Sequence, residues 1–215
     1  MTYSAVIICS EHEQLLERFG DERGFPRHQS EVALEISLDF SGPSKPEPSG
    51  FMPRLLCVKQ FFHALVNRTE AYEYPHCLGL IEFGTAAEVK LDLTSYFEGF
   101  KSALDKTEAA GDTACFDALQ TAAIKLTEFN ATRTSKGKTA ATLRIICLSD
   151  GKDTKSVISA FRTAACLREQ NILCDAVMIG EHMSRELLAI AKSTGGYVSF
   201  ITRVCPPLLM TIYQR

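Results

Sequence analysis

Apolar and polar residues alternate with the period of a β-strand at several points along the chain. Between residues 32 and 38, apolar residues occupy every second position, which predicts a strand with one apolar face. Near-continuous apolar runs at 77–83, 143–149 and 172–179 predict strands buried on both faces, as in a parallel sheet covered by helices. The alternating run at 87–91 follows so closely on 77–83 that we expect the two to pair antiparallel.

The stretches between these strands carry apolar residues at helical spacing. Helices are predicted at about 53–67, 95–104, 113–126, 154–170 and 184–192. In the fourth of these, Val157 and Phe161 are expected to face inward. Residues 130–141 are polar and rich in Lys and Thr, which favours a solvated loop. Gly195 and Gly196 are expected to end the last helix, and residues 197–201 are predicted to form a closing strand.

Strand and helix alternate from residue 31 onward, a pattern typical of α/β proteins. It predicts a three-layer α/β/α sandwich with a mostly parallel central sheet and one antiparallel edge strand. A chain of 215 residues is long enough for one domain of this kind with an appendage. We therefore expect residues 1–30 to form an N-terminal appendage, or an extra strand and helix, and residues 31–215 to form the main domain.

Composition narrows the classes of function. The net charge is −3 and the pI is about 6.0, so no excess of basic residues predicts binding to nucleic acid. No apolar run approaches the roughly 20 residues that a membrane-spanning helix needs. The eight cysteines include no Cys-x-x-Cys pair and lie mostly in apolar segments. We expect them to be reduced thiols, which indicates an intracellular, reducing compartment.

Candidate chemistry gathers where predicted strands end. Asp39 follows the first buried strand of the main domain, and Asp150 follows the strand at 143–149. The carboxyl ends of parallel strands share one edge of a sheet, so these carboxylates meet there if the two strands are neighbours. Thr113 precedes a predicted helix and can lie at the same edge. Hard oxygen ligands of this kind suit Mg²⁺. Each of these residues alone is also common where a strand passes into a loop.

Three motifs together resemble the von Willebrand factor type A domain family. The family's metal-ion-dependent adhesion site contains Asp-x-Ser-x-Ser, a distant Thr after Gly, and an Asp-Gly that closes a later strand. The matching segments here are Asp39-Phe40-Ser41-Gly42, Gly111-Asp112-Thr113 and Leu148-Ser149-Asp150-Gly151. Pro43 stands where the family has its second serine, and Ser44 follows one residue late. The ligands that the resemblance implies are Asp39, Ser41, Ser44, Thr113 and Asp150.

The resemblance implies a protein-binding module rather than an enzyme, with no catalytic residues. Its cofactor would be Mg²⁺, with Mn²⁺ or Ca²⁺ as alternatives, and an acidic side chain of a partner protein would complete the coordination. Gly42, Asp112 and Gly151 border the predicted ligands and are expected to contact the partner. Two alternatives stay open. One is a metal-free scaffold within a larger multidomain assembly, and the other is a metal-assisted hydrolase with Asp112 as general base.

Overall fold

The computed structural model of this chain describes residues 3–8, 33–37, 54–73, 76–107, 112–149, 153–179, 183–201 and 211–213. In chain order these residues form β1 (Tyr3–Ile8), β2 (Ala33–Ser37), α1 (Arg54–Ala71), β3 (Leu78–Phe83), β4 (Ala87–Thr94), α2 (Phe97–Asp105), α3 (Cys115–Ser135), β5 (Leu143–Ser149), α4 (Ala160–Glu169), β6 (Ile172–Ile179), α5 (Arg185–Thr194), β7 (Val198–Ile201) and β8 (Thr211–Tyr213). None of these helices is long and apolar enough to cross a membrane.

The strands form a single sheet in the order β4-β3-β1-β2-β5-β6-β7-β8. Strands β2, β5, β6 and β7 are parallel to one another. Strand β3 runs in the same direction, because β2 and β3 both pair antiparallel with β1. The predicted mostly parallel sheet and its antiparallel edge strand, β4, are thereby confirmed. Two further strands are antiparallel to the main direction, β1 inside the sheet and β8 at the other edge.

Strand β1 shows how the first residues join the rest of the chain. Residues 1–30 were expected to contribute an extra strand, and Tyr3–Ile8 is one. It lies in the interior of the sheet, where Ala5 pairs with Ile81 of β3 and Ile7 pairs with Glu35 of β2. The predicted division between residues 30 and 31 lies outside the described residues and stays a prediction.

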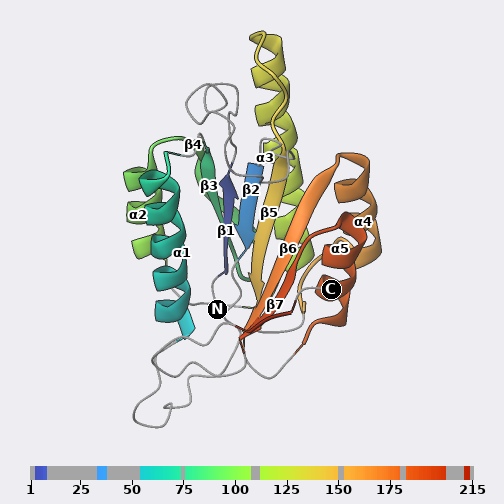
Figure 1. Cartoon of the computed structure of the whole chain (residues 1–215). Helices are drawn as coiled ribbons and strands as arrows, with labels where there is room; N and C mark the ends of the chain where they lie inside the picture. Colours follow the sequence, from blue (N-terminus) through green and yellow to red (C-terminus); the bar gives the residue numbers. More distant parts are fainter. Residues whose placement is uncertain are drawn as a thin grey trace.

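Helices cover both faces of the sheet, with α1 and α2 on one side and α3, α4 and α5 on the other (Figure 1). Strand β5 shows why its sequence is mostly apolar. Leu143, Ile145 and Cys147 pack in the core under α3, α4 and α5, whereas Ile146 and Leu148 pack in the core under α1 and α2. Because alternate side chains enter two different cores, both faces of this strand are largely apolar, and its one charged residue, Arg144, is paired with Asp175 of β6 at 2.6 Å.

The prediction of a loop at residues 130–141 is wrong over its first half, because α3 continues to Ser135. Its last turns bind the backbone that follows the helix. The Asn130 side chain accepts a hydrogen bond from the Ala141 N–H at 2.8 Å, and the Arg133 guanidinium donates to the Thr139 carbonyl at 3.1 and 3.2 Å. These contacts make helix the better solution for polar residues that are neutral in propensity.

The prediction of a helix at 154–170 is wrong at its start, since α4 begins only at Ala160. The expectation that Val157 and Phe161 face inward is also wrong, because their exposed fractions are 93% and 85%. Residues 153–158 bind to the N-terminus of α3 and do not form helix, and α4 buries Thr163 and Leu167 in place of Phe161. The predicted end of α5 is confirmed, with Gly195 in the left-handed conformation at φ +81°.

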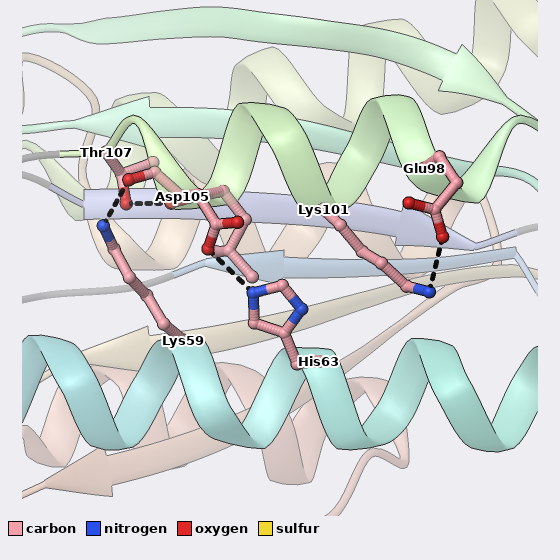
Figure 2. Close-up of polar contacts among 7 residues, drawn as sticks. Lys59, His63, Glu98, Lys101, Asp105 and Thr107 are labelled. Carbon is pink, nitrogen blue, oxygen red and sulfur yellow. Dashed lines mark hydrogen bonds and ion pairs between the residues drawn. The ribbon is translucent and has the colours of Figure 1, made fainter.

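Helices α1 and α2 are joined by polar contacts above their apolar core (Figure 2). His63 of α1 points toward α2, and its Nε2 lies 2.8 Å from Oδ1 of Asp105. The Lys59 ammonium donates to the backbone carbonyl of the same residue at 2.7 Å. Lys101 of α2 binds Glu98 on its own helix at 2.8 Å and Glu70 on α1 at 2.7 Å. We call these contacts the α1–α2 ion-pair cluster.

Candidate functional site

The edge of the sheet at which the parallel strands end is the candidate site. Strands β2 and β5 are neighbours, and Ser37 at the end of β2 pairs with Cys147 near the end of β5. The strands that precede Asp39 and Asp150 therefore end side by side, as the sequence prediction required. The predicted site residues outside the described ranges are Asp39, Ser41, Gly42, Ser44, Asp150 and Gly151.

Thr113 is the predicted ligand that the structure does describe. It is fully buried, and its backbone is bound on both sides. Its carbonyl accepts hydrogen bonds from the N–H groups of Thr154 and Lys155, both at 2.9 Å, and its own N–H donates to the Thr154 hydroxyl at 3.0 Å. The next N–H, that of Ala114, donates to the Gly84 carbonyl just past the end of β3 at 2.8 Å. Thr113 is thus fixed at the predicted edge.

The first turn of α3 is capped by side chains that come from far along the chain. Its N-cap residue is Ala114, which has no side-chain acceptor, so the first N–H groups need partners from elsewhere. Asp153 accepts from the N–H of Cys115 at 2.7 Å. The Ser156 hydroxyl accepts from the N–H groups of Phe116 at 2.9 Å and Asp117 at 3.2 Å. It also donates a hydrogen bond to Asp153, which orients both caps.

Helix α3 in turn binds the backbone of residues 157 and 158 through the side chain of Asp117. Its carboxylate accepts from the N–H of Val157 at 3.0 and 3.1 Å and from the N–H of Ile158 at 3.0 Å. Side chains of residues 153–158 therefore satisfy the backbone of α3, and a side chain of α3 satisfies the backbone of residues 153–158. We call residues 153–158 the α3 clamp. A carboxylate bound to a helix N-terminus is also favoured by the helix dipole.

The sequence prediction did not identify the α3 clamp. The signal was the run Asp153-Thr154-Lys155-Ser156, which holds three short polar side chains of the kind that bind backbone groups near helix ends. The apolar residues that follow, at helical spacing, instead predict that residues from 154 onward begin the next helix. That helix, α4, instead uses Ser159 as its N-cap, with the Arg162 N–H donating to the serine hydroxyl.

Asp112, predicted to contact a partner or to act as a base, lies beside Thr113 in an exposed position. One of its carboxylate oxygens is 3.4 Å from the Lys155 ammonium. Both side chains are about half exposed, so this ion pair is weak. The pair places one basic and one acidic group next to the predicted metal site.

The chemistry of the described residues fits part of the predicted metal site. The Thr113 side chain supplies a hard hydroxyl oxygen of the kind that Mg²⁺ prefers. Asp153 is committed elsewhere, because its Oδ1 accepts from Cys115 and Ser156 and its Oδ2 accepts from the Ser156 N–H at 3.2 Å. Within the described ranges, no three His, Cys, Asp or Glu side chains are grouped so as to hold a metal ion. The carboxylates of the predicted site are Asp39 and Asp150, outside those ranges.

A sequence model of the von Willebrand factor type A domain matches residues 49–205. This chain therefore belongs to the von Willebrand factor type A domain family, as the three motifs suggested, and its fold is the α/β sandwich of that family. The matched region contains Thr113 and Asp150 and begins after Asp39, Ser41 and Ser44.

Individual relatives are larger proteins. The probable bifunctional E2/E3 enzyme R795 of Acanthamoeba polyphaga mimivirus is 30% identical over 194 residues, which cover 89% of this chain and 14% of that protein. A UPF0353 protein of Mycobacterium tuberculosis is 30% identical over 164 residues, 72% of this chain and 46% of the relative. A solved von Willebrand factor type A structure from Catenulispora acidiphila is 24% identical, with a TM-score of 0.45 over 55% of this chain and 28% of that one.

Proposed function

We propose that this chain is a protein-binding module whose partner binds at a metal ion held at the carboxyl edge of the sheet. Domains of this family are generally protein-interaction modules. The observation that carries the proposal is the position of Thr113, which is fully buried at this edge with its backbone fixed by three hydrogen bonds to residues 154 and 155. A ligand that is already in place when the metal arrives loses little freedom on binding.

In this proposal Mg²⁺, or Mn²⁺ or Ca²⁺ in its place, is held by Asp39, Ser41, Thr113 and Asp150, with Ser44 as a further candidate. These oxygens supply only part of the coordination shell of a hard cation. An acidic side chain of the partner protein completes it, and the charge–metal contact then dominates the binding energy. Lys155, half exposed beside Thr113, can exchange its weak ion pair with Asp112 for an acidic group of such a partner.

Substitution of Thr113 tests the metal site without a known partner. Thr113→Val keeps the buried shape and removes the hydroxyl, and Thr113→Ser is the matched control that keeps the hydroxyl. We expect Thr113→Val to weaken Mn²⁺ binding by about tenfold or more, a loss of the size known for disturbed metal sites. Thr113→Ser should bind within a few-fold of the wild type. Free Mn²⁺ is measured by electron paramagnetic resonance, with circular dichroism as the control for folding.

Equal Mn²⁺ binding by all three proteins, or none by the wild type, would contradict a metal ligand role for Thr113. That result would favour the alternative of a metal-free scaffold in a larger assembly. This alternative also has support of its own. The chain spans only a small share of the mimivirus relative, so a domain of this kind also occurs inside a much larger protein. Within a protein of that kind, we propose that the domain recruits partners and that the chemistry resides elsewhere.

The hydrolase alternative makes a different prediction. It requires metal-dependent turnover of a phosphoester by the chain alone, and loss of that turnover in Asp112→Asn. No turnover of p-nitrophenyl phosphate in millimolar Mg²⁺ is the result we expect from a binding module. A rate above that of buffer which Asp112→Asn abolishes would favour the hydrolase.

We also propose that the domain works in a reducing compartment. Among the described residues, Cys77, Cys115, Cys147, Cys166 and Cys174 are reduced cysteines outside any disulfide, and three of them are buried. Alkylation of the denatured protein, isolated without reductant, should label all eight cysteines. A pair that resists labelling until it is reduced would count against this location.

A further inference from the structure

The two most exposed large apolar side chains of the described residues lie close together in the chain. Val157 is 93% exposed and Phe161 is 85% exposed, well above the next, Tyr96, at 67%. An apolar side chain that is almost fully in water contributes little to the stability of its own domain. An exposed phenylalanine is also the kind of residue that protein interfaces use as an anchor. We call Val157 and Phe161 the apolar pair.

The apolar pair is held on a rigid base. The N–H of Val157 is bound by both oxygens of the Asp117 carboxylate, and the N–H of Ile158 is bound by one of them. Phe161 lies in the first turn of α4, whose N-cap Ser159 binds the next N–H along. The backbone beneath both side chains is therefore ordered before any partner arrives, which lowers the entropy cost of binding.

The apolar pair also lies next to the proposed metal site. The N–H of Lys155, two residues before Val157, donates to the carbonyl of Thr113. Helix α4 follows β5, so its first turn starts from the edge at which the parallel strands end. One partner segment can therefore reach the metal site and the apolar pair together.

The charges around the apolar pair indicate the chemistry of its occupant. From Thr154 to Arg168 the charged residues are Lys155, Arg162 and Arg168, all basic. Within the described part of the chain, the Arg162 guanidinium is exposed and makes no ion pair. Lys155 is weakly paired with Asp112 at 3.4 Å, and the Asp117 and Asp153 carboxylates accept hydrogen bonds from backbone N–H groups. The exposed Arg162, next to Phe161 in the sequence, is therefore the basic group that complements an acidic segment.

We propose that Val157 and Phe161 form the apolar half of the partner-binding surface, in an extension of the proposed metal site that rests on that proposed function. The occupant is an acidic segment of a partner protein that also carries a large apolar side chain. Its carboxylate binds at the metal edge, its apolar side chain packs on Val157 and Phe161, and Arg162 pairs with a further acidic residue. Specificity then comes from the apolar pair, because a carboxylate on a metal ion distinguishes few partners.

A displayed library of random 12-residue peptides, selected on the whole chain in millimolar Mg²⁺, tests this proposal. We expect the selected sequences to be enriched in Asp or Glu together with Phe, Leu or Trp. The strongest is synthesised with a fluorescein label, and its affinity is measured by fluorescence anisotropy. Phe161→Ser should weaken binding by about tenfold, which is typical of an anchor residue, and Val157→Ser by a smaller factor. Arg162→Glu should weaken binding most at low salt.

Tyr96→Ser is the matched control. Tyr96 is also an exposed aromatic, but it follows β4, which runs opposite to β3, so it lies toward the other edge of the sheet. Its substitution should leave the affinity unchanged. Because all four side chains are exposed, the variants should melt within a few degrees of the wild type. Mn²⁺ binding should be the same in Phe161→Ser and in the wild type, because the apolar pair is not a ligand.

The two proposals can fail separately. Binding that chelation abolishes and that Phe161→Ser leaves unchanged would overturn the apolar pair and keep the metal site. Binding that survives chelation but falls in Phe161→Ser would keep the apolar pair and overturn the metal site. Selection of basic peptides would overturn the proposed occupant. Self-association of the chain that Phe161→Ser abolishes, measured by sedimentation, would do the same, since a second copy would then cover the pair.

Discussion

Two places in this molecule join helices to their surroundings by polar contacts, and they do so differently. At the α3 clamp, Asp153 and Ser156 bind backbone N–H groups that the helix itself cannot satisfy. In the α1–α2 ion-pair cluster, side chains bind mainly one another on the surface, where Asp105 is 60% exposed (Figure 2). The clamp lies at the edge that carries Thr113, whereas the cluster lies above an apolar core that already holds α1 and α2 together.

The clamp and the cluster differ in what replaces each contact when it is lost. An exposed carboxylate or imidazole that loses its partner binds water instead, so each surface pair contributes little. A helix N–H that loses its cap in a partly buried position has no such replacement and costs more. Contacts of similar length therefore carry different free energies. The larger contribution lies where the chain must hold a site in position.

The largest expected effect follows from loss of the Asp153 cap. Asp153→Ala removes the acceptor for the Cys115 N–H and the group that orients Ser156. Hydrogen bonds to a charged group are involved, so we expect the free energy of unfolding to fall by about 2–3 kcal/mol. Urea denaturation followed by circular dichroism measures it. The same variant should weaken Mn²⁺ binding, because Thr113 is fixed by the same segment.

The matched control is Asp153→Asn, which keeps one oxygen to accept from Cys115 and loses the charge. It should lose about half as much stability as Asp153→Ala. A change below about 0.5 kcal/mol in Asp153→Ala would show that water replaces the cap and would remove the contrast with the ion-pair cluster.

An effect of intermediate size is expected at Glu82 in β3, whose carboxylate is only 9% exposed and lies 3.1 Å from the Lys90 ammonium. Burial raises the pKa of Glu82 above its ordinary value, and the hydrogen bond from Lys90 opposes this shift without cancelling it. The folded state therefore binds this proton more tightly than the unfolded state. Stability should fall as the pH rises from about 4.5 through the raised pKa.

Glu82→Gln removes that titration. We expect the variant to gain stability relative to the wild type as the pH rises to neutral, and to be closest to it in acid. Urea denaturation at several pH values between acid and neutral measures the difference. If the variant is less stable than the wild type at neutral pH, then the Lys90 ion pair outweighs the cost of burial. Glu82 would then resemble the α3 clamp more than the surface pairs.

The smallest expected effect is loss of the contact between His63 and Asp105. Asp105→Asn removes the negative charge and keeps the backbone carbonyl that Lys59 binds. Because both side chains are substantially exposed, we expect a loss of about 0.2–1 kcal/mol that shrinks with added salt. Thermal melts at low and high ionic strength measure it. A loss as large as that of Asp153→Ala would mean that the cluster, and not the apolar core, holds the two helices together.

The candidate site was predictable in outline because its motifs lie next to strands with strong patterns. Thr113 was predicted from its position before a helix and from the family resemblance, and it lies at the expected edge. The neighbouring pairing of β2 and β5, which the prediction assumed, is confirmed. The roles of Asp39, Ser41, Ser44 and Asp150 stay predictions.

The clamp could not be predicted in the same way, because its contacts join residues about 40 positions apart. Asp153 and Ser156 cap α3 and not the helix that follows them. Local sequence indicates that such residues will cap a helix, but it does not say which helix.

The sequence by itself determined the elements whose pattern admits one solution. The apolar runs of β5 and β6 had to be buried on both faces, and Gly195 had to end α5, because these are consequences of local chemistry. Only the tertiary structure decided that β1 lies inside the sheet and that Val157 and Phe161 face water. Helical spacing marks which residues could share a face. Whether that face is covered depends on the contacts that the segment makes with distant parts of the chain. Here residues 153–158 bind the N-terminus of α3 and do not extend α4.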